Sequence, residues 1–188
     1  MPNYVKNRIV IHNISKQRVI EFQKKYFNKY DEFDFQKVTR MPKQLMETEE
    51  STRTPKEVYE QNKAKYGYRS WYDWAIDNWG TKWNAGECDS FYNNKDLIIT
   101  FETAWSAPEP IIKKIIKSNK DLTIEVTYAD EDIGSNTGYI KGENGKVVEN
   151  IEYENGSKIA YETYIELWDD EQLVYNEEKD NYEFREEW

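Results

Sequence analysis

Hydrophobic positions along the chain repeat with two different periods, and the period changes several times. Apolar residues that alternate with polar ones, or that run almost without interruption, predict strands. The stretch from Leu122 to Tyr128 alternates strictly, whereas residues 96–103 contain the near-continuous apolar run L-I-I-T-F, as in a central strand. On this basis we predict strands at residues 4–13, 33–38, 96–103 and 122–128.

Apolar residues spaced three or four positions apart predict helices between these strands. One helix is expected from Ser15 to about Asn28, and a second begins at Thr54-Pro55 and ends before Gly67. A further helix begins at Ser70. Another helix has a buried stripe made of Ile111, Ile112, Ile115 and Ile116.

The helix that begins at Ser70 carries an unusual density of tryptophan and is expected to end at Gly80. Large aromatic side chains bury much area, so the pattern favours a structural aromatic cluster packed against the core. An aromatic site for a ligand or partner is the alternative. The members of this predicted cluster are Trp71, Trp74, Trp79, Trp83 and Trp105.

Turn signals dominate the last quarter of the chain. Asn144-Gly145 and Asn155-Gly156 each lie between strand-like runs, which predicts a three-stranded antiparallel meander over residues 138–167. In its last strand, one face is apolar and the other is acidic and carries tyrosine. The aromatic residues of the tail after Trp168 are compatible with a further pair of strands.

The order of elements predicts an α+β fold: a ferredoxin-like split β-α-β sandwich with an inserted helical segment and a C-terminal antiparallel β-meander. Residues 1–137 are expected to form the ferredoxin-like core, with the helical insertion at 43–85. Residues 138–188 are expected to form the acidic meander and tail, packed on the core.

Charge is distributed unevenly along the 188 residues, whose net charge is −10. Residues 143–188 hold 15 acidic and 4 basic side chains, whereas the other 142 residues hold 21 acidic and 22 basic ones. The C-terminal quarter is therefore a poor surface for phosphates. A long apolar span is absent and Cys88 is the single cysteine, so we expect a cytoplasmic protein in a reducing compartment with no membrane partner.

Candidate catalytic and metal-binding patterns are weak. His12 is the single histidine and has no nucleophile near it in sequence. The acidic run that begins at Asp130 lacks the glycine and glutamate of a calcium loop, so solvated turn residues are expected there, with a weak magnesium site at Asp130 and Asp132 as the alternative. We predict no catalytic residues, no cofactor and no metal.

Several motifs resemble one family. They are M-P-N-Y-V-K-N at the start, R-M-P-K at 40–43, W-Y-D-W-A-I-D-N-W-G-T-K-W-N-A at 71–85, F-E-T-A-W-S-A-P at 101–108 and Y-A-D-E-D-I-G at 128–134. Over roughly residues 1–145 the chain resembles the YubB-type, or Api-like, ferredoxin-like proteins of phages and plasmids. The resemblance implies a ferredoxin-like core and an origin on a mobile element, and it implies no activity.

These features favour a non-catalytic protein that binds a host protein, such as an anti-CRISPR-like inhibitor whose acidic surface imitates nucleic acid. A purely solvating role of the acidic residues stays open. An RNA- or nucleotide-binding ferredoxin-like module is the other alternative, although the usual K/R-G-F/Y-G/A-F-V-x-F/Y string is absent. The predicted partner-binding residues are Glu152, Glu162, Tyr164, Glu166, Asp169, Asp170 and Glu171.

Overall fold

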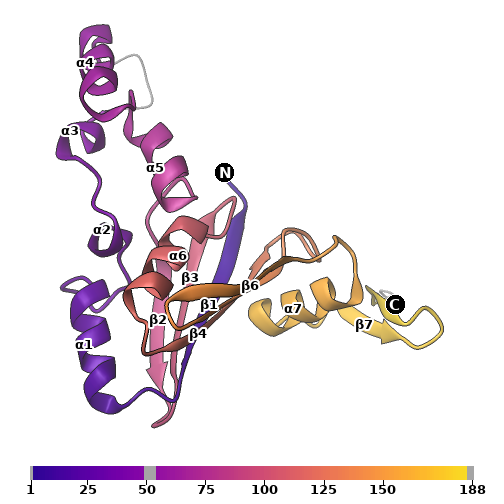
Figure 1. Cartoon of the computed structure of the whole chain (residues 1–188). Helices are drawn as coiled ribbons and strands as arrows, with labels where there is room; N and C mark the ends of the chain where they lie inside the picture. The colour runs from indigo at the N-terminus through magenta and orange to yellow at the C-terminus, as the bar shows by residue number, and fades with distance from the viewer. Residues whose placement is uncertain (1, 49–53, 186–188) are drawn as a thin grey trace.

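The computed structural model describes residues 2–48 and 54–185. Among them, six strands form one antiparallel sheet in the order β2-β3-β1-β4-β5-β6 (Figure 1). The strands of this sheet are β1 (Tyr4–His12), β2 (Gly86–Tyr92), β3 (Leu97–Ala104), β4 (Thr123–Asp130), β5 (Gly138–Glu143) and β6 (Lys146–Glu152).

Seven helices and a separate hairpin complete the described residues. The hairpin pairs β7 (Leu173–Asn176) with β8 (Asn181–Phe184). The helices are α1 (Lys16–Tyr26), α2 (Phe35–Val38), α3 (Lys43–Met46), α4 (Lys56–Tyr66), α5 (Trp71–Trp79), α6 (Glu109–Ser118) and α7 (Lys158–Trp168).

The first four strands of the sheet have the ferredoxin-like arrangement. Chain order runs β1-α1, then the inserted helices, then β2-β3-α6-β4, and β1 lies between β3 and β4. Ile9 of β1 is opposite Ile99 on one side and Val126 on the other. The predicted α+β, split β-α-β fold is therefore confirmed.

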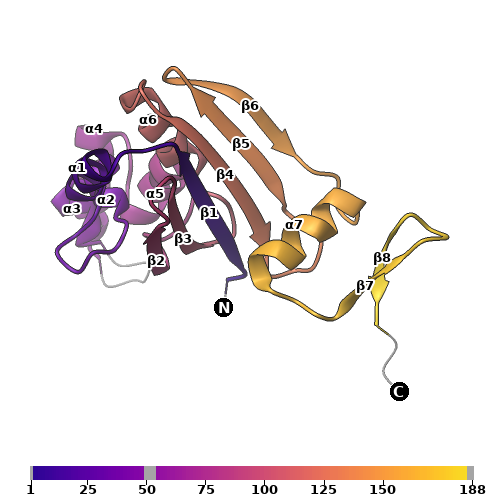
Figure 2. The same ribbon diagram turned by 90° about the horizontal axis from the view of Figure 1, so that it is seen from below.

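Helices α1 and α6 cover one face of the sheet, and the main core lies between these helices and the sheet. Ile9 and Ile11 lie on the same face of β1, where every second residue is buried, and they are almost fully buried together with Phe22 of α1 and Ile112 of α6. The apolar spacing of both helices places one stripe against the sheet, which explains why their sequences predicted them well. Figure 2 shows these helices on the side of the sheet away from α7.

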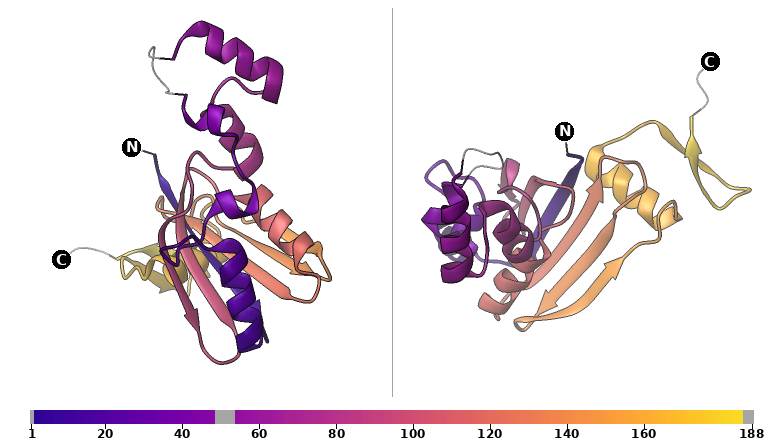
Figure 3. Two further views of the ribbon diagram at one scale, coloured as in Figure 1. Left: turned by 90° about the vertical axis from the view of Figure 1, so that its left-hand side faces the viewer. Right: turned by 90° about the horizontal axis from the view of Figure 1, so that it is seen from above.

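Of the inserted helices, α2 lies beside α1 and α6, whereas α3 and α4 lie beyond one end of the sheet (Figures 1 and 3). The insertion begins earlier than predicted, because residues 33–38 form a single bridge and the short helix α2 instead of a strand. Asp34 is the reason: its Oδ1 accepts a hydrogen bond from the Gln36 backbone N–H at 2.9 Å and caps the turn. The helical insertion predicted at 43–85 starts with α3, and residues 49–53 lie outside the described residues.

Gly67 and Gly80 end α4 and α5 with left-handed backbones, at φ +83° and +82°. Both helix ends were predicted, because glycine adopts this conformation without the steric cost that a Cβ imposes. The edge strand β2 follows and was not predicted. Its side chains on the core-facing side include Cys88 and Ser90, which give little apolar signal.

The C-terminal region differs most from the prediction. Asn144-Gly145 forms the expected turn between β5 and β6, and both strands extend the main sheet beyond β4. The predicted third strand of the meander is wrong, because residues 158–168 form α7, which Ser157 caps through a hydrogen bond from the Ala160 backbone N–H. The helix lies on the sheet face opposite α1 and α6, and β7 and β8 project beyond it (Figure 2).

Candidate binding surfaces

Helix α7 is fixed to the sheet by contacts near its C-terminal end. The indole Nε1–H of Trp168 donates a hydrogen bond to the carbonyl oxygen of Ala129 at 3.1 Å, and the Lys6 ammonium lies 4.4 Å from the centre of the Trp168 ring. Two residues earlier, Glu166 lies 2.8 Å from the Arg8 guanidinium. These contacts place the acidic helix on the otherwise open face of the sheet.

Three of the seven predicted partner-binding residues are used inside the fold. Tyr164 is 6% exposed and packs with Ala129 and Leu167 in a second, smaller core, where burial, with Asp170 beside it, raises its pKa to about 12. The Asp170 carboxylate accepts hydrogen bonds from the Tyr164 hydroxyl and from Gln172. Glu166 pairs with Arg8.

The other four predicted residues remain available for an external contact. Within residues 2–48 and 54–185, no salt bridge or side-chain hydrogen bond involves the carboxylates of Glu152, Glu162, Asp169 and Glu171. Glu152 ends β6, Glu162 lies on α7, and Asp169 and Glu171 follow the helix. We name these four carboxylates the acidic C-terminal surface. It is formed at the end of β6, on α7 and in the residues directly after this helix, whereas the prediction placed residues 158–167 on a strand.

The predicted structural aromatic cluster divides into a buried and an exposed part. Trp74 and Trp79 are buried with edge-to-face rings 5.5 Å apart, and the Trp79 Nε1–H donates to the Thr39 carbonyl oxygen at 2.9 Å. Trp71 is half-buried against the same core. The expectation of burial is wrong for Trp83 and Trp105, which are 39% and 42% exposed.

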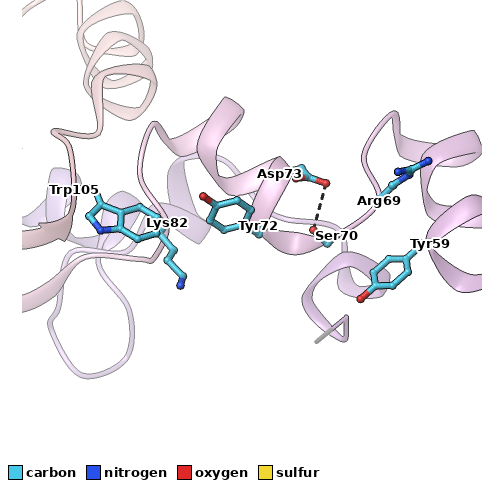
Figure 4. A pocket seen from close by; sticks show the side chains of 7 residues that line it. All are labelled: Tyr59, Arg69, Ser70, Tyr72, Asp73, Lys82 and Trp105. Carbon is cyan, nitrogen blue, oxygen red and sulfur yellow. Dashed lines mark hydrogen bonds between the residues drawn. The ribbon is translucent and has the colours of Figure 1, made fainter. Parts of the chain in front are cut away.

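A groove of about 650 Å³ runs from the core to the helical insertion beside the exposed tryptophans. Figure 4 shows its side chains in a row, with Trp105 and Lys82 at one end, Tyr72 in the middle, and Tyr59 and Arg69 at the other. Its remaining lining residues are Ser70 and Asp73. We name this feature the aromatic groove.

Lys82 connects the aromatic side chains at one end of this groove. Its Nζ lies 5.8 Å from the ring centre of Tyr72, 4.9 Å from that of Trp83 and 5.1 Å from that of Trp105. A cation at such distances from several ring faces is attracted to each of them. The sequence pattern pointed to the tryptophans but not to Lys82, Tyr72, Tyr59 or Arg69, because the groove joins segments that are distant along the chain.

The sheet residues that were considered for catalysis or metal binding have structural contacts. His12 lies between two carboxylates, with Nε2 3.2 Å from Glu125 and Nδ1 3.7 Å from Asp96. The Asp130 carboxylate is 5% exposed and accepts hydrogen bonds from Asn3, from Asn136 and from the Asp132 backbone. In the described part of the chain, no three His, Cys, Asp or Glu residues are grouped so that they could hold a metal ion.

Cys88 is half-buried on β2, and its Sγ lies 3.8 Å from the carbonyl oxygen of Phe33. Removal from water disfavours the thiolate and raises the thiol pKa to about 11. Reactive cysteines have lowered pKa values, so Cys88 has the properties of a packing residue. None of the helices in the described residues is both long and apolar enough to cross a bilayer.

The fold and these surfaces define an α+β protein with a ferredoxin-like domain. Residues 78–183 match the family described as "Ferredoxin-like domain in Api92-like protein", and the chain therefore belongs to the Api92-like family. The matched range includes α7 and the β7–β8 hairpin, so the family's domain continues well beyond the resemblance noted up to residue 145.

The crystal structure of the protein api92 from Yersinia pseudotuberculosis is similar to this chain, with a TM-score of 0.50 and 10% sequence identity. The similarity covers 83% of this chain and 99% of that one, and at this identity it shows the fold alone. No curated protein sequence matches the chain.

Proposed function

We propose that the chain is a non-catalytic binding protein of a phage or another mobile element, and that its acidic C-terminal surface binds a basic surface of a host protein in the bacterial cytoplasm. The observation that carries this proposal is the set of four carboxylates at the end of β6, on α7 and directly after α7 that make no salt bridge among the described residues. Their helix is held on the sheet by Trp168, so the charges are presented from a fixed support.

The net charge of this region supports the same partner chemistry. Residues 143–188 hold 15 acidic and 4 basic side chains, and a field of one sign attracts a surface of the opposite sign over several ångströms. The exposed side chains of Ile159, Tyr175 and Phe184 belong to the same region. An apolar centre beside a charged rim is typical of protein interfaces.

A nucleic-acid-handling defence effector, such as a CRISPR effector, is the proposed class of partner. Such a protein holds its guide or target in a groove of Lys and Arg side chains, and spaced carboxylates can occupy the positions of phosphates. The resemblance to the YubB-type proteins of mobile elements supports this class, because an element that enters a bacterium meets such defences.

The test is affinity capture from a bacterium that carries such a defence system, followed by mass spectrometry. The tagged chain is compared with a triple variant, Glu152→Lys, Asp169→Lys and Glu171→Lys. We expect the parent to retain a partner that is released as salt rises and that survives nuclease treatment. The triple variant should lose it.

The matched control is Glu57→Lys, Asp77→Lys and Glu87→Lys, which changes the net charge equally through exposed residues outside the acidic C-terminal surface. This control should retain the partner. Equal capture by a folded triple variant and by the control would falsify the assignment of the interface.

A further inference from the structure

Helices α1, α2 and α6 form one layer on the same side of the sheet (Figure 2). The side chain of Asn119, directly after α6, donates a hydrogen bond to the Tyr26 hydroxyl of α1 at 2.9 Å and accepts one from Arg18 at 2.9 Å. The Lys114 ammonium of α6 donates to the hydroxyl of Thr39, directly after α2, at 2.8 Å. The three helices therefore present one continuous outer surface.

This helical layer carries an excess of positive charge. Residues 15–40 and 109–121 hold 11 basic and 6 acidic side chains, whereas the rest of the chain holds 15 basic and 30 acidic ones. The apolar stripes of α1 and α6 face the sheet, so the lysines on the opposite side of each helix face outward. Six exposed lysines define what we name the basic helical surface: Lys24, Lys25, Lys37, Lys114, Lys117 and Lys120.

The lysines of this surface are available to an external anion. Within residues 2–48 and 54–185, no salt bridge joins any of the six to a carboxylate. The carboxylates of the same layer have other partners. Asp121 pairs with Arg18 at 2.8 Å. Glu109 pairs with Lys113 at 2.7 Å, and Asp34 caps α2. Even when all six carboxylates of the layer are counted against its 11 cations, the layer keeps a net positive charge.

Charge density and the absence of exposed rings identify the class of partner. Helix α1 has 11 residues and is about 16 Å long, and a DNA duplex of that length carries about nine phosphate charges. A single strand is held largely by base stacking, but the exposed positions of α1, α2 and α6 carry no aromatic ring. A lipid surface does not fit, because the apolar stripes of α1 and α6 are already buried against the sheet.

We propose that the basic helical surface binds double-stranded DNA through its phosphates, without reading the base sequence. Lysine contacts to phosphates supply such affinity, because each contact releases counterions from the duplex. The acidic residues of α7 lie on the opposite face of the sheet and repel phosphates, so the duplex approaches from the side of α1 and α6 (Figure 2). The proposal is independent of the proposed function, because no residue of the basic helical surface belongs to the acidic C-terminal surface.

The test is fluorescence anisotropy with two short fluorescein-labelled DNA duplexes of unrelated sequence, at several salt concentrations. We expect the parent to bind both duplexes equally, with an affinity that falls as salt rises. In the triple variant Lys25→Gln, Lys117→Gln and Lys120→Gln, the affinity should fall roughly tenfold or more. The slope of log affinity against log salt should become less steep by about 0.9 for each phosphate contact that is lost.

The matched control is Lys56→Gln, Lys63→Gln and Lys65→Gln, which removes the same charge from exposed positions of α4, beyond one end of the sheet. This control should bind both duplexes as the parent does. Glutamine suits a helix as well as lysine does, so both triple variants should give the circular dichroism melt of the parent. Equal affinity of the two triple variants for the duplexes would overturn the inference.

Two competitors test the class of partner. Oligo(dT) and poly-glutamate should each displace the labelled duplex less effectively than unlabelled duplex does. Equal competition by either one would overturn the inference, because it would assign the surface to single strands or to acidic proteins. Charge reversal of the acidic C-terminal surface should leave duplex binding intact, and the Lys25, Lys117 and Lys120 variant should still capture the host protein. Each of the two proposals can therefore fail without the other.

Discussion

The indole of Trp168, at the end of α7, donates its hydrogen bond to the backbone carbonyl of Ala129 on β4, and this contact joins the last helix to the sheet. Trp168→Phe keeps a ring in place but removes the donor. We expect a loss of about 1 kcal/mol in the free energy of unfolding, the usual net value of one hydrogen bond. Urea denaturation followed by circular dichroism measures it. Trp83→Phe, at a half-exposed site, should change the midpoint little.

Truncation of a buried tryptophan should lower the free energy of unfolding much more than truncation of an exposed one. Trp74 is 6% exposed, so Trp74→Ala should cost roughly 3–5 kcal/mol, as large-to-small core changes do. Trp83→Ala, at 39% exposure, should cost about 1 kcal/mol or less. Urea midpoints compare the variants. If Trp74→Ala unfolds at the parent midpoint, the indole is not part of the core.

Charge reversal at two acidic residues of α7 should change the stability by different amounts, although both side chains are partly exposed. Glu166 faces Arg8 at 2.8 Å, and the Arg8 Nε is buried without a hydrogen-bond partner among the described residues. Glu166→Lys therefore places two cations together and should cost about 1 kcal/mol, whereas Glu162→Lys should stay within about 0.5 kcal/mol. Thermal melts at low and high salt measure both, and salt should reduce the difference. Equal melting temperatures at low salt would contradict this role of Arg8.

The raised pKa of the Cys88 thiol should make the stability of the fold depend on pH in the alkaline range. Its thiol pKa is raised from 9.0 to about 11, so the unfolded chain loses this proton at a lower pH than the folded chain. The stabilisation is fully present below pH 9 and decreases as pH rises toward 11. Urea midpoints should fall over this window, and less so for Cys88→Ser. Alkylation of the native thiol by iodoacetamide should remain slow until the same pH range.

Elements with one dominant pattern could be predicted from the sequence. The spacing of the isoleucine stripe in α6 fits a helix and does not fit a strand. Its members, Ile111, Ile112, Ile115 and Ile116, are all buried on one side of the helix. Gly67 and Gly80 also fixed two helix ends correctly, since the requirement for a left-handed backbone is local. In such segments, local preference and tertiary packing agree.

The errors occur where two patterns fit the same residues. In α7, Ile159, Tyr161, Thr163 and Ile165 alternate as in a strand, while Ala160, Thr163, Tyr164 and Leu167 have helical spacing. The second set is the buried one, because the open face of the sheet near Ala129 offers a surface for one helical stripe. That surface exists only after β1 and β4 have paired, so no local signal contains it.

The binding surfaces were predicted only in part, for a related reason. The acidic residues are counted easily in the sequence, but which of them pair inside the fold depends on the distant Arg8. The aromatic groove combines Tyr59 and Tyr72 from the insertion with Trp105 from the loop after β3. A composition rich in tryptophan indicates an aromatic cluster and cannot distinguish its exposed members from its buried ones.

The central position of β1 also affects how the chain folds during synthesis. β1 is synthesised before its partners β3 and β4, so Tyr4 has no partner until Ala104 and the residues after Asp130 have emerged. Helices of the insertion can form earlier from local contacts, whereas the sheet must close over a long sequence separation. Until then, the apolar side of β1 lacks its partner strands, and unpaired strands of this kind favour aggregation of incompletely folded chains.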